Sequence, residues 1–132
     1  MEELLFSTKK KEELINITRE IEQAVRIYDI KDGICVLFVP HATAALFINE
    51  NEPGLKEDLL NSLSLIVPNR EGYKHDRLDK NATSHIKATL VSPSLTLTIH
   101  EGSLVLGTWQ QILLCEFDGP RDRKVLLQVV GQ

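Results

Sequence analysis

Apolar and polar positions alternate over several short runs, a pattern that predicts strands along much of the chain. Residues 4–8 and 13–17 are expected to form the first two strands. Residues 34–39 are an unbroken apolar run, which is typical of a strand buried on both faces. Residues 95–99 alternate with period two, which indicates a half-buried strand. Further strands are expected at 104–106, 112–117 and 125–130.

Apolar residues three and four positions apart predict helices in three places. Residues 21–28 carry this spacing, and Thr18 just before them suits a helix cap. Pro53 suits the first position of a second helix, where its missing N–H would have no partner anyway. Asn81 is a plausible cap for a third, short helix that carries His85.

These elements predict one α+β domain spanning residues 1–132. A largely antiparallel or mixed β-sheet, curled or doubled, is expected to pack with two or three helices. A chain of this length typically buries about two thirds of the surface that its unfolded form exposes. The apolar content of 42% and the charged content of 26% are ordinary for a globular protein. The pattern therefore predicts a full hydrophobic core.

Composition and charge limit the kinds of partner that the protein can bind and the cellular compartment in which it is expected. The lysines at 9–11 are followed at once by glutamates at 12 and 13, so they predict a solvated turn and no nucleic-acid partner. No run approaches the ~18 apolar residues of a membrane span, and no signal-peptide pattern precedes the first strand. We therefore expect no membrane association and a cytoplasmic location. Cys35 and Cys115 lie in apolar runs, which favours two small buried side chains over a disulfide or a reactive thiol.

Candidate chemistry gathers in the polar stretch 73–85. His75 and His85 lie in it, and His41 follows a predicted strand end beside small residues. Together with Asp79, these imidazoles could supply ligands for a divalent metal such as zinc or magnesium. The spacing matches no named zinc motif, and hydrogen-bonded structural histidines are the competing interpretation.

A second group of polar residues lies near the end of the chain. Arg121 and Arg123 could hold a phosphate or a carboxylate, because guanidinium offers paired donors in a fixed fork. They could instead pair with Asp118 or Glu116 at a strand end. Glu116 lies in an apolar strand, where an unpaired carboxylate is costly, so an arginine partner is expected under either interpretation.

Four blocks of the sequence, in order, resemble the YjbQ family, and together they cover nearly the whole chain. They are residues 41–45 with 48–51, 73–85, 106–110 and 116–123. The resemblance implies an α+β domain that assembles as a homotrimer, with a pocket near the subunit contacts. It also implies a secondary thiamine-phosphate synthase, which joins a pyrimidine diphosphate to a thiazole phosphate. We expect a divalent metal ion, held by the histidines, to assist this reaction. Two departures stand out, since Lys80 and Ser92 occupy positions where the family usually has glycine.

The resemblance also implies roles for individual residues. The catalytic residues would be Glu50, Asp79 and Arg121; the residues that bind a small phosphorylated substrate would be Thr43, Asn49, Asn81, Trp109, Gln110 and Arg123; the metal ligands would be His41, His75 and His85. Two alternatives stay open. One is a non-catalytic protein that binds a metal or a phosphorylated ligand, and the other is a different transferase or hydrolase with thiamine-phosphate synthesis as a side activity.

Overall fold

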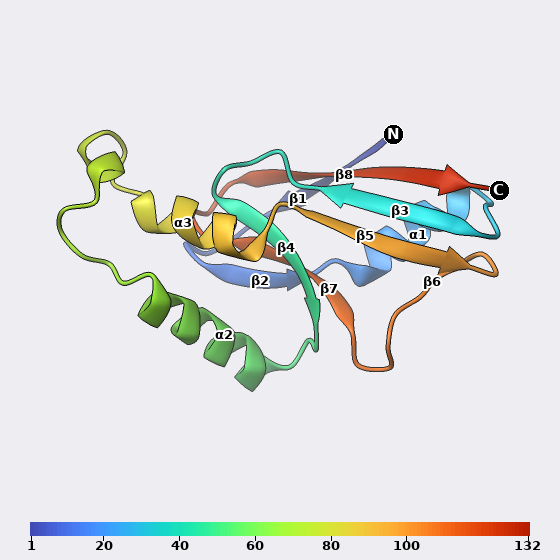
Figure 1. Ribbon diagram of the computed structural model, residues 1–132, viewed down its shortest axis with the longest axis horizontal. Helices are drawn as coiled ribbons and strands as arrows, with labels where there is room; N and C mark the ends of the chain where they lie inside the picture. Colours follow the sequence, from blue (N-terminus) through green and yellow to red (C-terminus); the bar gives the residue numbers. More distant parts are fainter.

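The computed structural model describes residues 1–132, whose strands form two antiparallel sheets (Figure 1). The five-stranded sheet has the order β1 (Glu2–Ser7), β8 (Asp122–Gly131), β3 (Gly33–Phe38), β5 (Ser94–His100) and β6 (Ser103–Leu104). The three-stranded sheet has the order β2 (Glu13–Asn16), β7 (Gln111–Glu116) and β4 (Ala44–Asn49). The helices are α1 (Thr18–Ile27), α2 (Pro53–Ile66) and α3 (Ala82–Val91), with a 3₁₀ turn, η1, at Lys74–Arg77. The predicted α+β domain is confirmed, and of the two sheet forms left open, curled or doubled, the structure has the doubled one.

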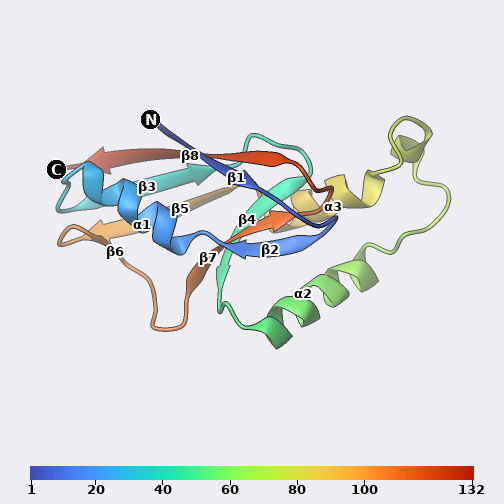
Figure 2. The same cartoon turned by 180° about the vertical axis from the view of Figure 1, so that it is seen from behind.

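The main core lies between α1 and the two sheets, as the reverse view shows (Figure 2). Alternate residues of β3 point into this core, so Cys35 and Leu37 are fully buried. Ile34 and Phe38, on the other face, are 42% and 41% exposed. The prediction of a strand buried on both faces is therefore wrong, because α1 and the second sheet cover only one face of β3.

The helix starts are only partly as predicted. Pro53 opens α2, as expected. Thr18, however, is the first residue of α1 and not its cap: the side-chain oxygen of Asn16 accepts the Thr18 N–H at 3.1 Å. Asn81 stands at the N-cap position of α3, but its side chain makes no capping bond there. The carboxylate of Asp76 accepts the Ala82 N–H instead, at 2.9 Å.

A smaller core attaches α3 to the three-stranded sheet. It consists of the buried side chains of Leu14, Ala45, Ala88, Cys115 and Phe117. The leucines of α2 pack only against its edge, and no residue of α2 is buried. From the end of α2 the chain runs through an arm, residues 67–81, that projects from the body before α3 returns to it (Figure 1). This arm and α3 carry the histidines of the polar stretch.

The two cysteines and the two residues at expected glycine positions behave as the sequence indicates. Cys35 and Cys115 are buried and unpaired; burial raises the pKa of the Cys35 thiol to about 11 and that of Cys115 still further, so both act as small apolar side chains. Lys80 and Ser92 have positive φ values of 55° and 101°. Glycine adopts such backbone conformations without steric cost, which explains why it is the expected residue at these two positions.

Candidate functional site

The site begins where β3 ends and leaves a neighbouring strand without a partner. β3 stops at Phe38, opposite Leu126 of β8, so the β8 backbone beyond Leu126 has no strand on that side. The imidazole of His41 replaces the missing strand as a hydrogen-bond partner, because its Nε2 accepts the Lys124 N–H at 2.8 Å. A nitrogen that accepts a hydrogen bond carries no proton, so neutral His41 holds its proton on Nδ1.

The surroundings of His41 keep it neutral. Burial lowers the pKa of His41, and the positive charge of Arg123 lowers it further. Lys124 and Arg121 act in the same direction, while Glu116 opposes them. His41 therefore presents a neutral N–H donor in a positively charged neighbourhood.

His85 lines the same cavity as His41. The two side chains line an open cavity of about 320 Å³, together with Ala42, Ala44, Ala88, Thr89 and Pro93. His85 comes from α3, which packs on β4, whereas His41 comes from the loop that precedes β4. The small residues leave room for a compact ligand between the two rings.

His75 packs directly against His85. The ring centroids are 4.5 Å apart and the ring planes meet at 74°, an edge-to-face contact. The Nε2 atom of His75 is buried with no hydrogen-bond partner, and the nearest carboxylate oxygen, from Asp79, is 3.7 Å away. The side-chain oxygen of Asn81 is likewise buried without a partner. Unpaired polar atoms of this kind are uncommon in folded proteins, so they mark a region where a ligand atom or water belongs.

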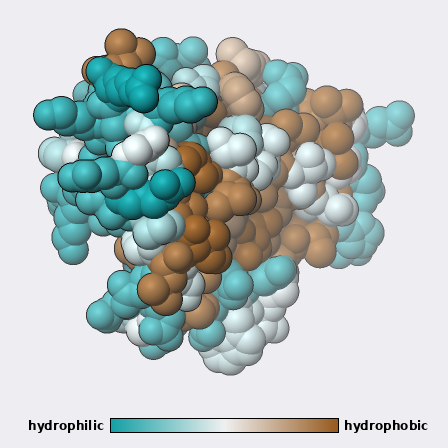
Figure 3. All heavy atoms as spheres, turned by 60° about the vertical axis from the view of Figure 1, so that its left-hand side comes forward, coloured by the Kyte–Doolittle hydropathy of each residue, from teal (hydrophilic) through white to brown (hydrophobic).

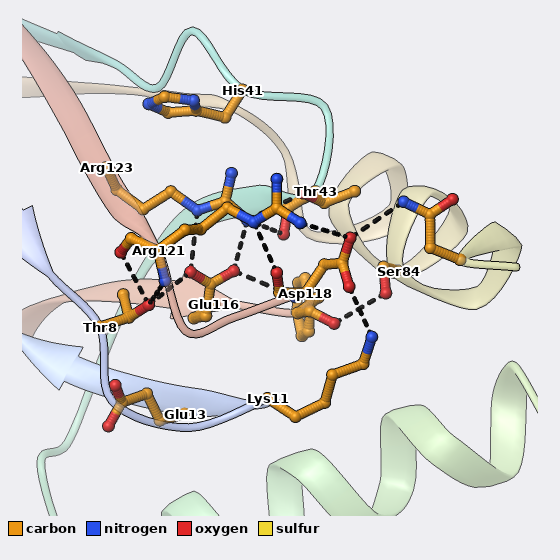
Figure 4. A network of polar contacts seen from close by, with 12 residues as sticks. Thr8, Lys11, Glu13, His41, Thr43, Ser84, Glu116, Asp118, Arg121 and Arg123 are labelled. Atoms are coloured by element: carbon orange, nitrogen blue, oxygen red, sulfur yellow. Dashed lines mark hydrogen bonds and ion pairs between the residues drawn. The ribbon is translucent and has the colours of Figure 1, made fainter. Parts of the chain in front are cut away.

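Beneath His41 lies a buried ion pair (Figure 4). Arg123 donates from Nε to Glu116 at 2.9 Å and makes a second bond from Nη2 to the other carboxylate oxygen. Both side chains are almost completely buried. The Arg123 guanidinium also donates to the Thr43 hydroxyl at 2.8 Å, and the Thr8 hydroxyl donates to Glu116 at 2.7 Å. The predicted pairing of Glu116 with an arginine is confirmed, and it fixes the loop that carries His41.

Asp118 joins three separate segments at the start of α3. It accepts hydrogen bonds from Lys11 at 2.5 Å, Asn81 at 2.9 Å and Arg121 at 3.1 Å (Figure 4). Burial on its own would raise the pKa of Asp118, but the bonds from Lys11 and Asn81 hold it below its usual value. The Arg121 guanidinium is more than half exposed, so it remains accessible while Asp118 orients it.

Other predicted site residues lie elsewhere. Asn49 is the last residue of β4 and pairs with Gln111 of β7, and Glu50 follows it. Trp109 is 73% exposed, and the Gln110 side chain accepts the Gly107 N–H at 2.8 Å. None of these residues lines the histidine cavity, because the length of β4 separates them from His41. Their predicted roles stay predictions, but they do not belong to one site within a single chain.

Sequence reasoning missed Lys124 and Lys11. Lys124 contributes a backbone N–H, which no side-chain pattern reveals. Lys11 was expected in a solvated turn, yet it reaches Asp118. The only sequence feature that indicated the contact between Lys11 and Asp118 was the presence of Asp118 itself, an acidic residue in the turn after an apolar strand.

The histidines do not form a metal centre within one chain. No group of three or more histidine, cysteine, aspartate or glutamate side chains is arranged to hold a metal ion. His41 Nε2 is occupied by the Lys124 N–H, and His75 and His85 meet ring to ring. The divalent metal at His41, His75 and His85 stays a prediction, and no chemical step is derived from it.

Fold and site together define an α+β protein with two antiparallel sheets and a small cavity between two histidines. The sequence matches the family described as UPF0047 protein YjbQ-like over residues 2–132, so the chain belongs to this family. It is similar to a UPF0047 protein of Archaeoglobus fulgidus, with 48% identity over 97% of this chain and 99% of the relative. It is also similar to UPF0047 protein YugU of Bacillus subtilis, with 36% identity over 97% of both chains. A crystal structure from Sulfolobus solfataricus P2, of a YbjQ-like protein of unknown function, superposes with a TM-score of 0.96 at 40% identity, covering 99% of this chain and 96% of that one.

These relatives correct the predicted function. None of their names mentions thiamine-phosphate synthesis, and the Sulfolobus protein is described as having no known function. The residues also form no metal site of the kind that the proposed mechanism required. The prediction of a metal-dependent enzyme like the secondary thiamine-phosphate synthases is therefore wrong.

None of the helices has the length and apolar character needed to cross a membrane.

Proposed function

We propose that the cavity between His41 and His85 is an acid–base site that acts on a small anionic molecule, with a phosphorylated compound as the favoured class. The observation that carries the proposal is that two histidines line one cavity of about 320 Å³, one of them with a fixed tautomer. A neutral imidazole that donates from Nδ1 can hydrogen-bond to a developing negative charge. The second imidazole, on His85, is then free to accept or supply a proton.

The preference for an anion rests on the charges around His41. Arg123, Lys124 and Arg121 all lie close enough to lower the pKa of His41. Arg123 is paired with the buried Glu116 and Arg121 with the partly buried Asp118, whereas Lys124 lies 3.9 Å from Glu3 at the surface. Arg121 is exposed and oriented by Asp118, so its guanidinium group can donate hydrogen bonds to a ligand oxygen. These cations do not line the cavity themselves, but their charges act on His41, where they would favour a phosphate or a carboxylate on the ligand.

Inorganic phosphate tests where an anion binds. With ¹⁵N-labelled histidine, we expect phosphate to shift the ring signals of His41 and His85 in NMR spectra. The His85→Asn variant should lose the phosphate response at His41. The signals of His100, which is exposed and paired with Asp32 at 2.8 Å, serve as the internal control. Equal shifts at His100, or an unchanged His41 response in the variant, would contradict the proposed site.

Turnover tests the acid–base role. We expect a mixture of small phosphorylated compounds, followed by ³¹P NMR, to contain one that the protein consumes. Loss of the acid–base group in His85→Asn should slow its consumption by about 10² to 10⁴-fold. Equal rates for the variant and the wild type would rule out His85 as the proton-transfer group.

We further propose that the chain assembles with copies of itself, as the homotrimer implied by the resemblance. Leu65 and Ile66 at the end of α2 are 83% and 67% exposed, and no residue of α2 is buried within the chain. On the side that carries α2 and the arm, Figure 3 shows a continuous apolar band between hydrophilic regions. An apolar surface of this kind is typical of an interface.

Light scattering after size-exclusion chromatography measures this assembly. The Leu65→Lys/Ile66→Lys double variant should elute as a monomer, because two buried lysines would be unpaired in the contact. Ile27→Lys, which replaces an exposed apolar residue of α1, is the matched control and should leave the mass unchanged. A wild-type chain that stays monomeric at ~10 μM would overturn the proposal, since an interface of standard size holds at such concentrations.

A further inference from the structure

A second cavity lies against the other face of α3. It measures about 260 Å³ and is lined by ten residues, among them Lys11, Lys80, Lys87, Thr83 and Ser84. It shares no residue with the histidine cavity, whose α3 residues are His85, Ala88 and Thr89. The 3.6-residue period of the helix places these two sets on neighbouring but separate faces. The second cavity is thus distinct from the site proposed above.

Its lining has more basic than acidic side chains. Three lysines face it with a single carboxylate, that of Glu12. The Lys87 ammonium donates to Glu12 at 2.8 Å and to the Ser64 hydroxyl at 3.1 Å. An ammonium group has three donors, so one N–H of Lys87 is left, although only 7% of the side chain is exposed. A buried donor without a partner is costly, and an anion in the cavity would satisfy it.

Lys80 is the second source of free positive charge. Lys11 is bound to Asp118, and Lys87 is bound to Glu12, whereas Lys80 forms no ion pair. It stands in a left-handed backbone conformation directly before α3 and lines both this cavity and the neighbouring one on the arm. Thr83 and Ser84 belong to the first turn of α3, where the helix dipole is positive. The charge and the dipole therefore act at the same place.

We propose that this cavity binds a small anion of the phosphate class, held by Lys80, the free donor of Lys87 and the first turn of α3. A phosphate oxygen accepts from ammonium and hydroxyl donors alike. In the first turn of α3, the Ser84 hydroxyl donates to the Phe117 carbonyl and the Ala82 N–H donates to Asp76, so the Thr83 hydroxyl is the side-chain donor left for a ligand. The Glu12 carboxylate does not oppose binding, because Lys87 already neutralises it. The site is independent of the acid–base chemistry at His41 and His85.

Lys80→Gly is the informative variant. Glycine adopts a φ of 55° more readily than lysine, so the variant keeps the fold while it loses the charge. Inorganic phosphate is titrated at constant ionic strength, and the backbone N–H signals of Thr83 and Lys87 are followed by NMR. We expect the wild type to give saturable shifts at both residues and Lys80→Gly to bind about tenfold more weakly.

Two further variants control the experiment. Lys80→Arg keeps the charge and should bind within about twofold of the wild type, whereas Lys31→Ala removes a lysine from outside the cavity and should change nothing. Unchanged binding in Lys80→Gly, or shifts that chloride reproduces equally well, would overturn the proposal. The His85→Asn variant separates the two sites: it should abolish the histidine response and leave the Thr83 and Lys87 shifts intact.

Discussion

Replacing Arg123 with methionine should lower the free energy of unfolding by about 3–5 kcal/mol, the usual effect of leaving a buried charge without its partner. Glu116 is completely buried, and Arg123 supplies two of its hydrogen bonds. Methionine fills part of the space but offers no donor to the carboxylate. Urea unfolding followed by circular dichroism measures the change. Arg121→Met is the matched control and should cost only about 0–1 kcal/mol, because the Arg121 guanidinium is exposed.

The pH dependence identifies the cause of this loss. Burial on its own would raise the pKa of Glu116, but hydrogen bonds from Arg123, from the Asp118 N–H and from Thr8 hold it below its usual value. In the wild type, Glu116 therefore contributes stability above its unfolded pKa and loses that contribution as the pH falls. In Arg123→Met, burial dominates and favours the protonated form. The stability deficit of the variant should shrink between about pH 7 and about pH 4; a constant deficit would mean that lost packing, and not charge, causes it.

The Glu116–Arg123 pair also shows what the sequence can predict. A carboxylate inside an apolar strand needs a cation, and two arginines, Arg121 and Arg123, follow within seven residues, so the sequence predicts an arginine partner; the structure shows that it is Arg123. The same applies to β5, where Leu97 and Ile99 are buried as their alternation predicted. Features of this kind depend on residues close in sequence or on burial alone.

Features that depend on register could not be predicted in the same way. Lys124 meets His41 because β3 stops opposite Leu126, and the stopping point of a strand has no signature in side-chain pattern. Asn49 and Trp109 were grouped with the histidines by resemblance, yet Asn49 lies at the far end of β4 and pairs there with Gln111, two residues after Trp109. The fold was therefore predictable from periodicity, whereas the membership of the site required the pairing of the strands.

Replacing Phe117 with alanine should lower the free energy of unfolding by about 3–5 kcal/mol, as expected for a large-to-small change in a core. Phe117 is 1% exposed and belongs to the small core that attaches α3 to the three-stranded sheet. Two of its neighbours there, Ala45 and Ala88, have side chains too short to fill the cavity that the substitution leaves. Urea unfolding measures the loss. Phe38→Ala, at a position 41% exposed, is the matched control and should cost much less.

The same void should also disturb the histidine cavity, because Ala88 contributes to both the small core and that cavity. α3 would keep its bond from the Ser84 hydroxyl to the Phe117 carbonyl, so the helix should remain formed but become less firmly placed. The ¹⁵N-histidine response of His85 to phosphate should then weaken in Phe117→Ala and recover in Phe117→Leu, which restores most of the volume. A stability loss below about 1.5 kcal/mol would show instead that α3 settles into the void. His85 would then move with α3. An unchanged His85 response in Phe117→Ala would instead show that the position of His85 does not depend on Phe117.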